Sequence, residues 1–446
     1  MLIRELHIQN FRRFEDLKVS FDDNLTVLVA RNGQGKTSIL DAITVLLGPF
    51  VGAFDLGRSK GFAAADARQH LDPETLNPRI YWPIRVEGTV AFPPAIQTEP
   101  GKDLQDHQLA RQLSSSKGTT SVGEVVALRR YGKILQENIN RQADHILPIL
   151  AYYGTNRHWT TNKNLSRKKV LTENRSIAYE DCFSSSSNYL QVQQWMAKAT
   201  MLKMQQNDPL LVPHVGVMAS RLEGIQQAVD AVLREEGWSR FGYYLGFEEL
   251  AMYHNELGHL PVSQLSDGIR GVVAMVADLA FRCVRLNDFY GPMAPEETHG
   301  IVLIDEIDQH LHPGWQQRIL PALRNAFPRI QFIVTTHSPE VLSTVESRQI
   351  RILEKGKCYG APAGALGAES SRLLQTVLGL KSLRPPVNEV DELNEYLELV
   401  YTGRWKDPRA VALRQKLDQL YQGEEPALLE ADLQIENQEW EAAAAP

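Results

Sequence analysis

The feature that most constrains the fold is the stretch VLVARNGQGKTS, residues 27–38 of the 446-residue chain. It begins as an apolar run that predicts a buried strand. It leads into an amphipathic helix from Gly35 to Leu47, which Gly48-Pro49 is expected to end. Apart from Ala30 at the first position, the stretch fits the phosphate-binding pattern GxxxxGK(S/T). A chance glycine-rich turn is the alternative, and the flanking strand and helix disfavour it.

This pattern arranges particular groups around a phosphate. Backbone N–H groups surround the β-phosphate, the helix N-terminus points its positive end at it, Lys36 reaches the β- and γ-oxygens, and the Thr37 hydroxyl binds Mg²⁺. Ala30 weakens nucleotide binding only if its position requires a positive φ, where a β-carbon costs about 1–2 kcal/mol. The predicted nucleotide-binding residues of the loop are Asn32, Gly33, Gln34, Gly35, Lys36, Thr37 and Ser38.

Two acidic residues follow a second apolar run. Ile301–Ile304 predicts a buried strand, and Asp305 and Glu306 lie at its carboxyl end, where parallel sheets bind ligands. Asp305 is predicted to hold Mg²⁺, and Glu306 to polarise the water that attacks the γ-phosphate. The alternative is a zinc or manganese site. Its ligands would come from Asp305, Glu306, Asp308, His310 and His312, but residues so close in sequence cannot all converge on one ion.

A histidine ends a third apolar run. Phe332–Thr336 predicts a strand, and His337 follows it, one strand–helix–strand unit after Asp305. A neutral imidazole at that edge of the sheet can bind the γ-phosphate and the attacking water. A lone histidine there is otherwise an ordinary polar strand end, and its spacing from Asp305 favours the functional interpretation.

Apolar strands that alternate with helices predict an α/β fold with a parallel sheet covered on both faces. Short strands in residues 1–30 and at Pro83–Phe92 predict an N-terminal β lobe, with a loop over Pro93–Ser121 and strands near Glu124–Arg130 and Pro148–Tyr153. Four segments are predicted: residues 1–160, the N-terminal half with the phosphate loop; 161–240, a basic loop and helical insertion; 241–360, the C-terminal half; and 361–446, an acidic helical extension.

Composition limits the possible classes of protein. With 43% apolar and 23% charged residues the chain is not disordered, and its three separated cysteines predict a reducing compartment and no disulfides. No apolar run is long enough for a bilayer span, so a cytoplasmic protein without a membrane partner is expected. A net charge of −7 argues against a protein coated in nucleic acid.

One basic stretch is a candidate contact for DNA or RNA, with a solvated loop as the alternative. Its residues are Arg157, Lys163, Arg167, Lys168, Lys169 and Arg175, with Trp159 among them.

The stretch LSDGIRG, Leu265–Gly271, is by itself an ordinary capped helix start. A phosphate loop, then this stretch, then a strand ending in Asp-Glu and a strand ending in Thr-His is the order of parts in ABC-type ATPases, and Leu265–Gly268 resembles their signature motif. The resemblance implies an ABC-type head in which Ser266 and Gly268 bind the γ-phosphate held by a second copy. It therefore implies a homodimer around two ATP·Mg²⁺.

Within that superfamily the chain is more similar to the branch of chromosome maintenance and double-strand-break repair. Ile8–Phe14, with the sequence IQNFRRF, resembles the start of that branch, and the resemblance places Arg12 near the nucleotide. The chain departs from the family at Ile269-Arg270, where many members have Glu-Gln. Gln69 is the position we assign to the magnesium-sensing glutamine.

Two further segments, Asp305–Pro313 and Gly364–Leu374, resemble the ATPases of bacterial anti-phage defence, including the Septu-type and retron-associated ATPases and the overcoming-lysogenisation-defect nucleases. The resemblance covers about residues 1–160 and 240–380. About 95 residues follow Ile350, without the strand pattern of a nuclease domain. Without a nuclease domain the chain is similar to the Septu-type ATPase, whose partner is a separate HNH-type nuclease. That nuclease is expected here to bind the acidic C-terminal helices. The alternatives are a DNA recombination or repair ATPase and a transporter's nucleotide-binding subunit.

Overall fold

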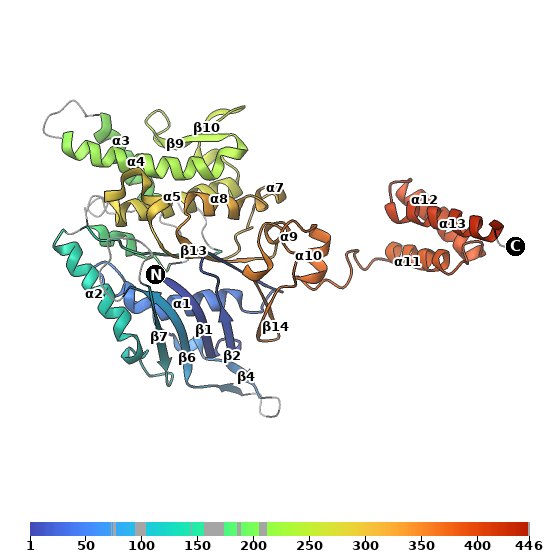
Figure 1. The fold of residues 1–446 in the computed structure, drawn as a ribbon, viewed down its shortest axis with the longest axis horizontal. Helices are drawn as coiled ribbons and strands as arrows, with labels where there is room; N and C mark the ends of the chain where they lie inside the picture. The colour runs from blue at the N-terminus through green and yellow to red at the C-terminus, as the bar shows by residue number, and fades with distance from the viewer. Residues whose placement is uncertain are drawn as a thin grey trace. The chain divides into compact units, whose positions relative to one another are not determined.

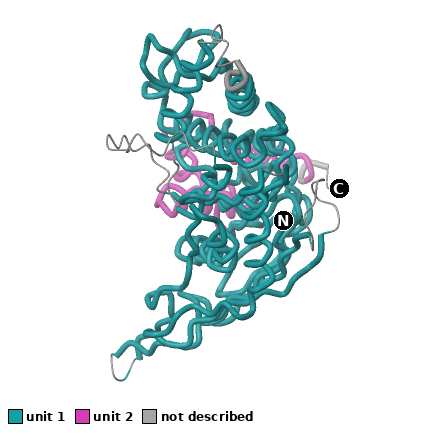
Figure 2. The backbone as a smooth tube through the Cα atoms, turned by 90° about the vertical axis from the view of Figure 1, so that its left-hand side faces the viewer, with its two compact units in different colours: residues 1–378 teal, residues 379–446 magenta. Residues whose placement is uncertain are grey.

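The computed structural model describes most of the chain. The described residues are 1–72, 74, 77–93, 104–142, 144–155, 174–184, 189–204 and 212–444. The chain forms two compact units, residues 1–378 and residues 379–446, which Figure 2 shows in separate colours. Each unit has its own cluster of buried apolar side chains, as expected of parts that fold around separate cores.

An antiparallel sheet of four strands forms the N-terminal lobe (Figure 1). In spatial order its strands are β2 (Phe14–Ser20), β1 (Leu2–Phe11), β6 (Ile84–Phe92) and β7 (Gln105–Leu113). Along β1 the side chains of Ile3, Leu6 and Ile8 are buried, while Glu5 between them is exposed. One face of the sheet therefore packs on the core and the other is turned outward.

Two predictions that follow this lobe are wrong. The predicted loop Pro93–Ser121 contains β7, whose polar sequence QDHQLARQL lies at a sheet edge and pairs with β6 alone. The strand predicted near Glu124–Arg130 is instead part of the helix α2 (Val126–Asn140). Leu128 and Leu135 lie two helical turns apart and are both buried, so this segment satisfies a helical rather than an alternating period.

A six-stranded sheet forms the centre of the first unit. In spatial order its strands are β15 (Lys357–Gly360), β14 (Ile350–Glu354), β3 (Leu25–Ala30), β13 (Ile330–Thr336), β12 (Gly300–Ile304) and β8 (Ile149–Tyr153). All neighbours pair in parallel except β15 with β14. Every residue of β3, β12 and β13 is buried, so both faces are covered and the carboxyl ends of these strands meet at one edge.

The helix α1 (Lys36–Val51) lies between the two sheets and contacts β1, β6 and β7 on one side and β3 and β13 on the other. It does not end at Gly48-Pro49, as predicted, but continues to Val51. Pro49 has no N–H to give to the carbonyl of Val45. The Arg111 guanidinium donates to that carbonyl instead, across 2.7 Å, so the proline leaves no unpaired acceptor.

A group of helices packs against the part of the central sheet that contains the edge strand β8. The predicted helical insertion is confirmed as α3 (Tyr189–Met204) and α4 (Val212–Leu233), both packed against α5 (Asp267–Leu286), which contacts β8. A three-stranded antiparallel sheet follows α4 and consists of β9 (Trp238–Tyr244), β10 (Glu249–His254) and β11 (Gly258–Pro261). Shorter elements are β4 (Gln69–Leu71), β5 (Pro78–Ile80), α6 (Ala294–Glu297), α7 (Pro313–Gln316), α8 (Ile319–Ala326), α9 (Pro339–Leu342) and α10 (Ser370–Thr376).

The second unit is a bundle of three helices, α11 (Asn388–Tyr401), α12 (Pro408–Tyr421) and α13 (Pro426–Ala444). Its buried side chains include Leu393, Leu413 and Leu428, one from each helix. The predicted architecture is therefore confirmed: an α/β head with an antiparallel lobe, an inserted helical subdomain and a C-terminal helical extension. The segment boundaries at residues 160, 240 and 360 stay predictions. Among the described helices none is long and apolar enough to cross a bilayer.

Candidate nucleotide site

The predicted phosphate loop opens into a cavity of about 330 Å³. The end of β3, the start of α1, the ends of β12 and β13 and the β1–β2 turn meet there. Its lining residues are Arg12, Arg13, Asn32, Gly33, Gln34, Gly35, Lys36, Thr37, Ser38, Asp305, Glu306 and His337. The structure thus brings together the loop, acidic and histidine residues predicted from segments hundreds of residues apart.

The loop has the backbone conformation that the pattern requires. Gly33 and Gly35 adopt positive φ values of 73° and 95°, where a β-carbon is strained. A β-carbon on Gly35 would also lie 2.5 Å from the ring of Phe14. Ala30, which replaces the first glycine of the pattern, is not among the positive-φ residues. Its side chain therefore imposes no backbone strain, and the departure from the pattern is conformationally neutral.

Lys36 is held at the floor of this cavity. Its side-chain nitrogen donates to the carbonyl of Ala30 across 3.1 Å and lies 2.6 Å from Nε2 of His337. Burial lowers the pKa of Lys36, and the nearby carboxylates of Asp305, Glu306 and Asp308 oppose that effect. An ammonium that is buried in this way is stabilised by an anion, and a triphosphate would supply one.

Asp305 and Thr37 place oxygen atoms side by side. The Thr37 hydroxyl donates to Oδ2 of Asp305 across 2.7 Å, and the Thr335 hydroxyl donates to Oδ1 across 2.6 Å. Asp305 is 2% exposed, so these bonds fix its carboxylate. A hydroxyl and a carboxylate at the edge of a phosphate cavity are hard oxygen ligands that suit Mg²⁺, with phosphates and water completing the octahedron. The residues present therefore fit the predicted ion.

Glu306 lines the same cavity from a strained position. Its backbone has a φ of 49°, in the left-handed region, and its N–H donates to the Thr335 hydroxyl across 2.7 Å. Non-glycine residues in this region cost about 1–3 kcal/mol and are concentrated at functional sites. Because of this turn Glu306 lines the cavity next to Asp305, the residue that precedes it in the sequence and that suits Mg²⁺.

His337 lies directly after β13 and faces Lys36. Burial lowers its pKa, and the Lys36 ammonium lowers it further, so the ring is neutral near pH 7. The next residue, Ser338, is the N-cap of α9, and its hydroxyl accepts from the N–H of Val341 across 3.1 Å, which anchors the turn that carries the histidine. A neutral ring with a fixed backbone can donate one hydrogen bond to a phosphate.

Two arginines from the β1–β2 turn reach the cavity. Arg12, which was predicted, is held by Asp41 at 2.7 Å and by Asp66 at 3.0 Å. Arg13, which was not predicted, is exposed and donates to the carbonyl of Gly33 in the phosphate loop. Its adjacency to Arg12 in the sequence is the one signal that could have found it. Arg12 is thus engaged by two carboxylates, whereas Arg13 lies exposed beside the phosphate loop.

Several predicted residues lie elsewhere. Gln69 is on the exposed strand β4 and does not line the cavity. The basic residues Arg157, Lys163, Arg167, Lys168 and Lys169 lie outside the described residues, as does Trp159. Arg175, at the end of that basic stretch, donates to the carbonyl of Leu286 across 2.6 Å and so contributes to packing. Within the described ranges no three acidic, histidine or cysteine residues are grouped so that they could hold a metal ion.

The predicted signature residues begin α5, away from the lining of their own chain's cavity. Ser266 is the N-cap residue, is exposed, and makes no side-chain capping hydrogen bond. Gly268 is buried, and a β-carbon there would overlap the carbonyl oxygen of His310. The helix start therefore presents a hydroxyl and backbone N–H groups at the surface, which is an arrangement that attracts anions.

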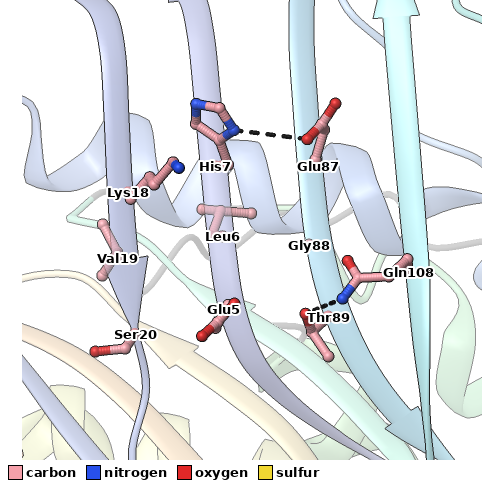
Figure 3. Close-up of a pocket in the computed structure, with 10 residues that line it drawn as sticks. All are labelled: Glu5, Leu6, His7, Lys18, Val19, Ser20, Glu87, Gly88, Thr89 and Gln108. Atoms are coloured by element: carbon pink, nitrogen blue, oxygen red, sulfur yellow. Dashed lines mark hydrogen bonds and ion pairs between the residues drawn. The ribbon is translucent and has the colours of Figure 1, made fainter.

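A second cavity, of about 370 Å³, lies on the outer face of the antiparallel sheet and shares no lining residue with the first (Figure 3). Two pairs of its polar side chains interact: His7 lies 3.5 Å from Glu87, and Gln108 donates to Thr89 across 2.9 Å. His7 also lies 3.0 Å from Asp16, which is outside the lining. This is typical of a hydrogen-bonded sheet surface rather than of a reactive site.

Comparison with known proteins agrees with this geometry. A family model described as "AAA domain" matches residues 5–236, more than half of the chain, and one described as "AAA domain, putative AbiEii toxin, Type IV TA system" matches residues 223–343. Two relatives are named retron ATPases. The retron Ec83 probable ATPase of Escherichia coli is 28% identical over 98% of this chain and 87% of its own length. The retron Vc95 probable ATPase of Vibrio cholerae serotype O1 biovar El Tor is 26% identical over 79% of this chain and 73% of its own length.

A third relative carries a different name. The Septu protein PtuA of Bacillus mycoides (strain KBAB4) is 29% identical over 46% of this chain and 28% of its own length. These matches accord with the resemblance to defence ATPases seen in the sequence. The chain belongs to the AAA-domain family and is similar to proteins named retron probable ATPase and Septu protein PtuA.

Proposed function

We propose that the protein binds ATP with Mg²⁺ and hydrolyses it. The observation that carries this proposal is the meeting of Lys36, Thr37, Asp305, Glu306 and His337 at one cavity. Lys36 and the loop N–H groups would bind the phosphates, and Thr37 and Asp305 would hold Mg²⁺, which neutralises charge on the β- and γ-oxygens when bound. Glu306 would orient and deprotonate the attacking water, and His337 would hydrogen-bond the γ-phosphate.

The composite site is the second part of the proposal. Two copies would face each other so that Ser266 and Gly268 of one copy cover the triphosphate on the phosphate loop of the other. The support is that Ser266 is exposed, that its side chain makes no capping hydrogen bond to α5, and that it does not line its own chain's cavity. A helix N-terminus of this kind binds an anion from outside its own chain.

The proposal is tested by ATP hydrolysis of the purified full chain. Wild type should release phosphate in the presence of Mg²⁺, and Lys36→Ala should abolish both binding and release. Glu306→Gln should bind ATP but hydrolyse it at least about a hundredfold more slowly, and it should accumulate as a dimer in light scattering. If Glu306→Gln hydrolyses ATP at the wild-type rate, the proposed role of this carboxylate is wrong.

We further propose that the protein regulates a separate nuclease subunit of HNH type in bacterial anti-phage defence, in the cytoplasm. Its support is the similarity to relatives named retron ATPase and Septu protein PtuA. The C-terminal unit is the proposed docking part, because α13 carries five acidic residues and no lysine or arginine. A nuclease that binds the DNA backbone carries basic surface, which such a helix attracts.

One surface of α13 fits this role. Leu429, Leu433 and Trp440 are 54%, 61% and 74% exposed and lie within roughly 40° of one another around the helix axis. Leu428 and Ala431 face the core of the bundle from the opposite side. The helix is therefore apolar on two sides, and only one of them is used within its own unit.

The docking proposal is tested by co-purification with a nuclease encoded beside the gene. Deletion of residues 387–446 should abolish co-purification and leave ATP binding intact. The double variant Leu433→Asn/Trp440→Gln should do the same. Leu420→Asn, which changes an equally apolar and 48% exposed residue of α12, should have no effect. Unchanged co-purification of the deletion variant would refute the proposal.

The basic stretch is the proposed contact for DNA or for the RNA and DNA of a retron. Replacing Lys163, Arg167, Lys168 and Lys169 by glutamine should make the salt dependence of nucleic-acid binding less steep, because fewer counterions are released. An unchanged slope would place the nucleic acid elsewhere.

A further inference from the structure

A single tyrosine joins the magnesium side of the site to the signature helix. Tyr153 is the last residue of β8, and its carbonyl accepts the N–H of Asp305 across 2.7 Å. Its hydroxyl donates to Oδ2 of Asp278, in the middle of α5, across 2.7 Å. Tyr153 therefore bonds to the backbone of Asp305 and, at its other end, to the helix that begins after Ser266.

The contact is buried and charged, which makes it difficult to break. Tyr153 and Asp278 are each 1% exposed, and Nε of Arg282 lies 2.8 Å from the same Asp278 oxygen. Burial raises the pKa of Tyr153 well above its ordinary value, so the hydroxyl keeps its proton at neutral pH. A buried carboxylate that loses a donor is strongly destabilised, so Asp278 holds Tyr153 in place.

The same helix touches the catalytic segment at a second point. At the start of α5, Gly268 packs against the carbonyl of His310, five residues after Asp305. Gly268 and Asp278 are separated by about 15 Å along the helix axis. A helix attached at two such points moves with the segment from Asp305 to His310 as one body.

We propose that Tyr153 is a positioning residue that transmits the nucleotide state of one site to the signature helix serving the other site. This inference rests on the proposed composite site. When Mg²⁺ and the γ-phosphate hold Asp305 in place, the Tyr153 bonds hold α5 and set the position of Ser266 toward the second copy. When product leaves, the same bonds carry the relaxation of the Asp305 strand end into α5.

Tyr153→Phe tests the transmission because it keeps the ring and removes only the hydroxyl. Tyr179→Phe is the matched control, since Tyr179 is 0% exposed and donates one hydrogen bond of 2.7 Å to the carbonyl of Pro148. We expect Tyr153→Phe to lower kcat for ATP by about tenfold with KM within about twofold, while the control stays within about twofold in both. An unchanged kcat in Tyr153→Phe, or an equal loss in both variants, would overturn the proposal.

A second readout does not depend on hydrolysis. A Ser266→Arg background prevents closure of two copies, so any effect of Mg·ATP on α5 must travel within one chain. On addition of Mg·ATP, hydrogen exchange of residues 266–276 should slow in Ser266→Arg and in the double variant Ser266→Arg/Tyr179→Phe. It should slow clearly less when Tyr153→Phe is added, because only the contact of Gly268 with His310 then remains. Equal slowing in all three proteins, or slowing in none of them, would overturn the proposal even if the wild type proved inactive as an ATPase.

Discussion

The Thr37 hydroxyl donates a hydrogen bond of 2.7 Å to the Asp305 carboxylate, joining the first turn of α1 to the end of β12. The two residues are 268 positions apart in the sequence. Their oxygens are already adjacent, so little rearrangement is needed for both to face one Mg²⁺. A site that is preformed in this way loses less free energy to ordering when it binds its ligand.

The first prediction concerns this pair. Asp305→Asn replaces an anionic ligand by a neutral amide, which binds Mg²⁺ more weakly. We expect ATP hydrolysis to fall at least about a hundredfold, while binding of ATP without Mg²⁺ stays within about threefold. Calorimetric titration with and without Mg²⁺ measures both affinities. An Mg²⁺ requirement equal to that of the wild type would exclude Asp305 from the metal site.

The second prediction compares two glycines of α5. Gly268→Ala should destabilise the protein by about 1–3 kcal/mol, because its β-carbon would overlap the His310 carbonyl. Gly271→Ala, with nothing within 4 Å of the added carbon, should stabilise it by about 0.5–1 kcal/mol through helix propensity. Urea unfolding of both variants measures these free energies. Equal effects would show that the packing of Gly268 against the catalytic segment is unimportant.

The third prediction is a pH dependence. Burial, assisted by Lys36, lowers the pKa of His337 below the ordinary value of 6.5. The stability that this neutral ring contributes is therefore present above the unfolded-state pKa and is lost as the pH falls through the folded-state pKa. Between about pH 7.5 and about pH 5.5 the wild type should lose more free energy of unfolding than His337→Gln, which has no titrating ring. Parallel losses in urea unfolding would contradict the lowered pKa.

The fourth prediction separates the two arginines of the β1–β2 turn. Arg13→Gln should weaken ATP binding by about tenfold, because the exposed guanidinium is a free donor to phosphate beyond its bond to Gly33. Its stability should change by no more than about 0.5 kcal/mol. Arg12→Gln should lower stability by about 1 kcal/mol, because it leaves Asp66 and Asp41 without this cation. If Arg13→Gln lowered stability and Arg12→Gln weakened ATP binding instead, the ion pairs of Arg12 with Asp41 and Asp66 would not explain the roles of the two arginines.

The sequence predicted the parts of the site that lie at strand ends. Phosphate-loop glycines, Asp305 and His337 each follow a continuous apolar run, and such runs become parallel buried strands whose ends meet at one edge. The order of these strands in the sheet, in contrast, is set by long-range pairing. The strand β7 was missed for the same reason: its sequence is polar, and its strand structure comes from pairing with β6.

Contacts between side chains of different elements were the other part that sequence could not predict. Asp278 appears in the sequence only as a charge that interrupts an apolar run, yet it is buried and bonded to Tyr153 and Arg282. Nothing in the spacing of these three residues identifies them as partners. Arg13 was missed for a similar reason, because its contact with Gly33 depends on how the β1–β2 turn meets the phosphate loop.

A mixture of two inactive variants tests whether each site is built from two copies of the chain. Lys36→Ala lacks a working phosphate loop and Ser266→Arg lacks a working signature helix, so each should be inactive alone. A mixed dimer has one site with Lys36 from one copy and Ser266 from the other. Mixing should restore roughly a quarter of wild-type hydrolysis, since about half the dimers are mixed and each of these has one intact site out of two. A mixture as inactive as its components would show that the two copies do not share their sites.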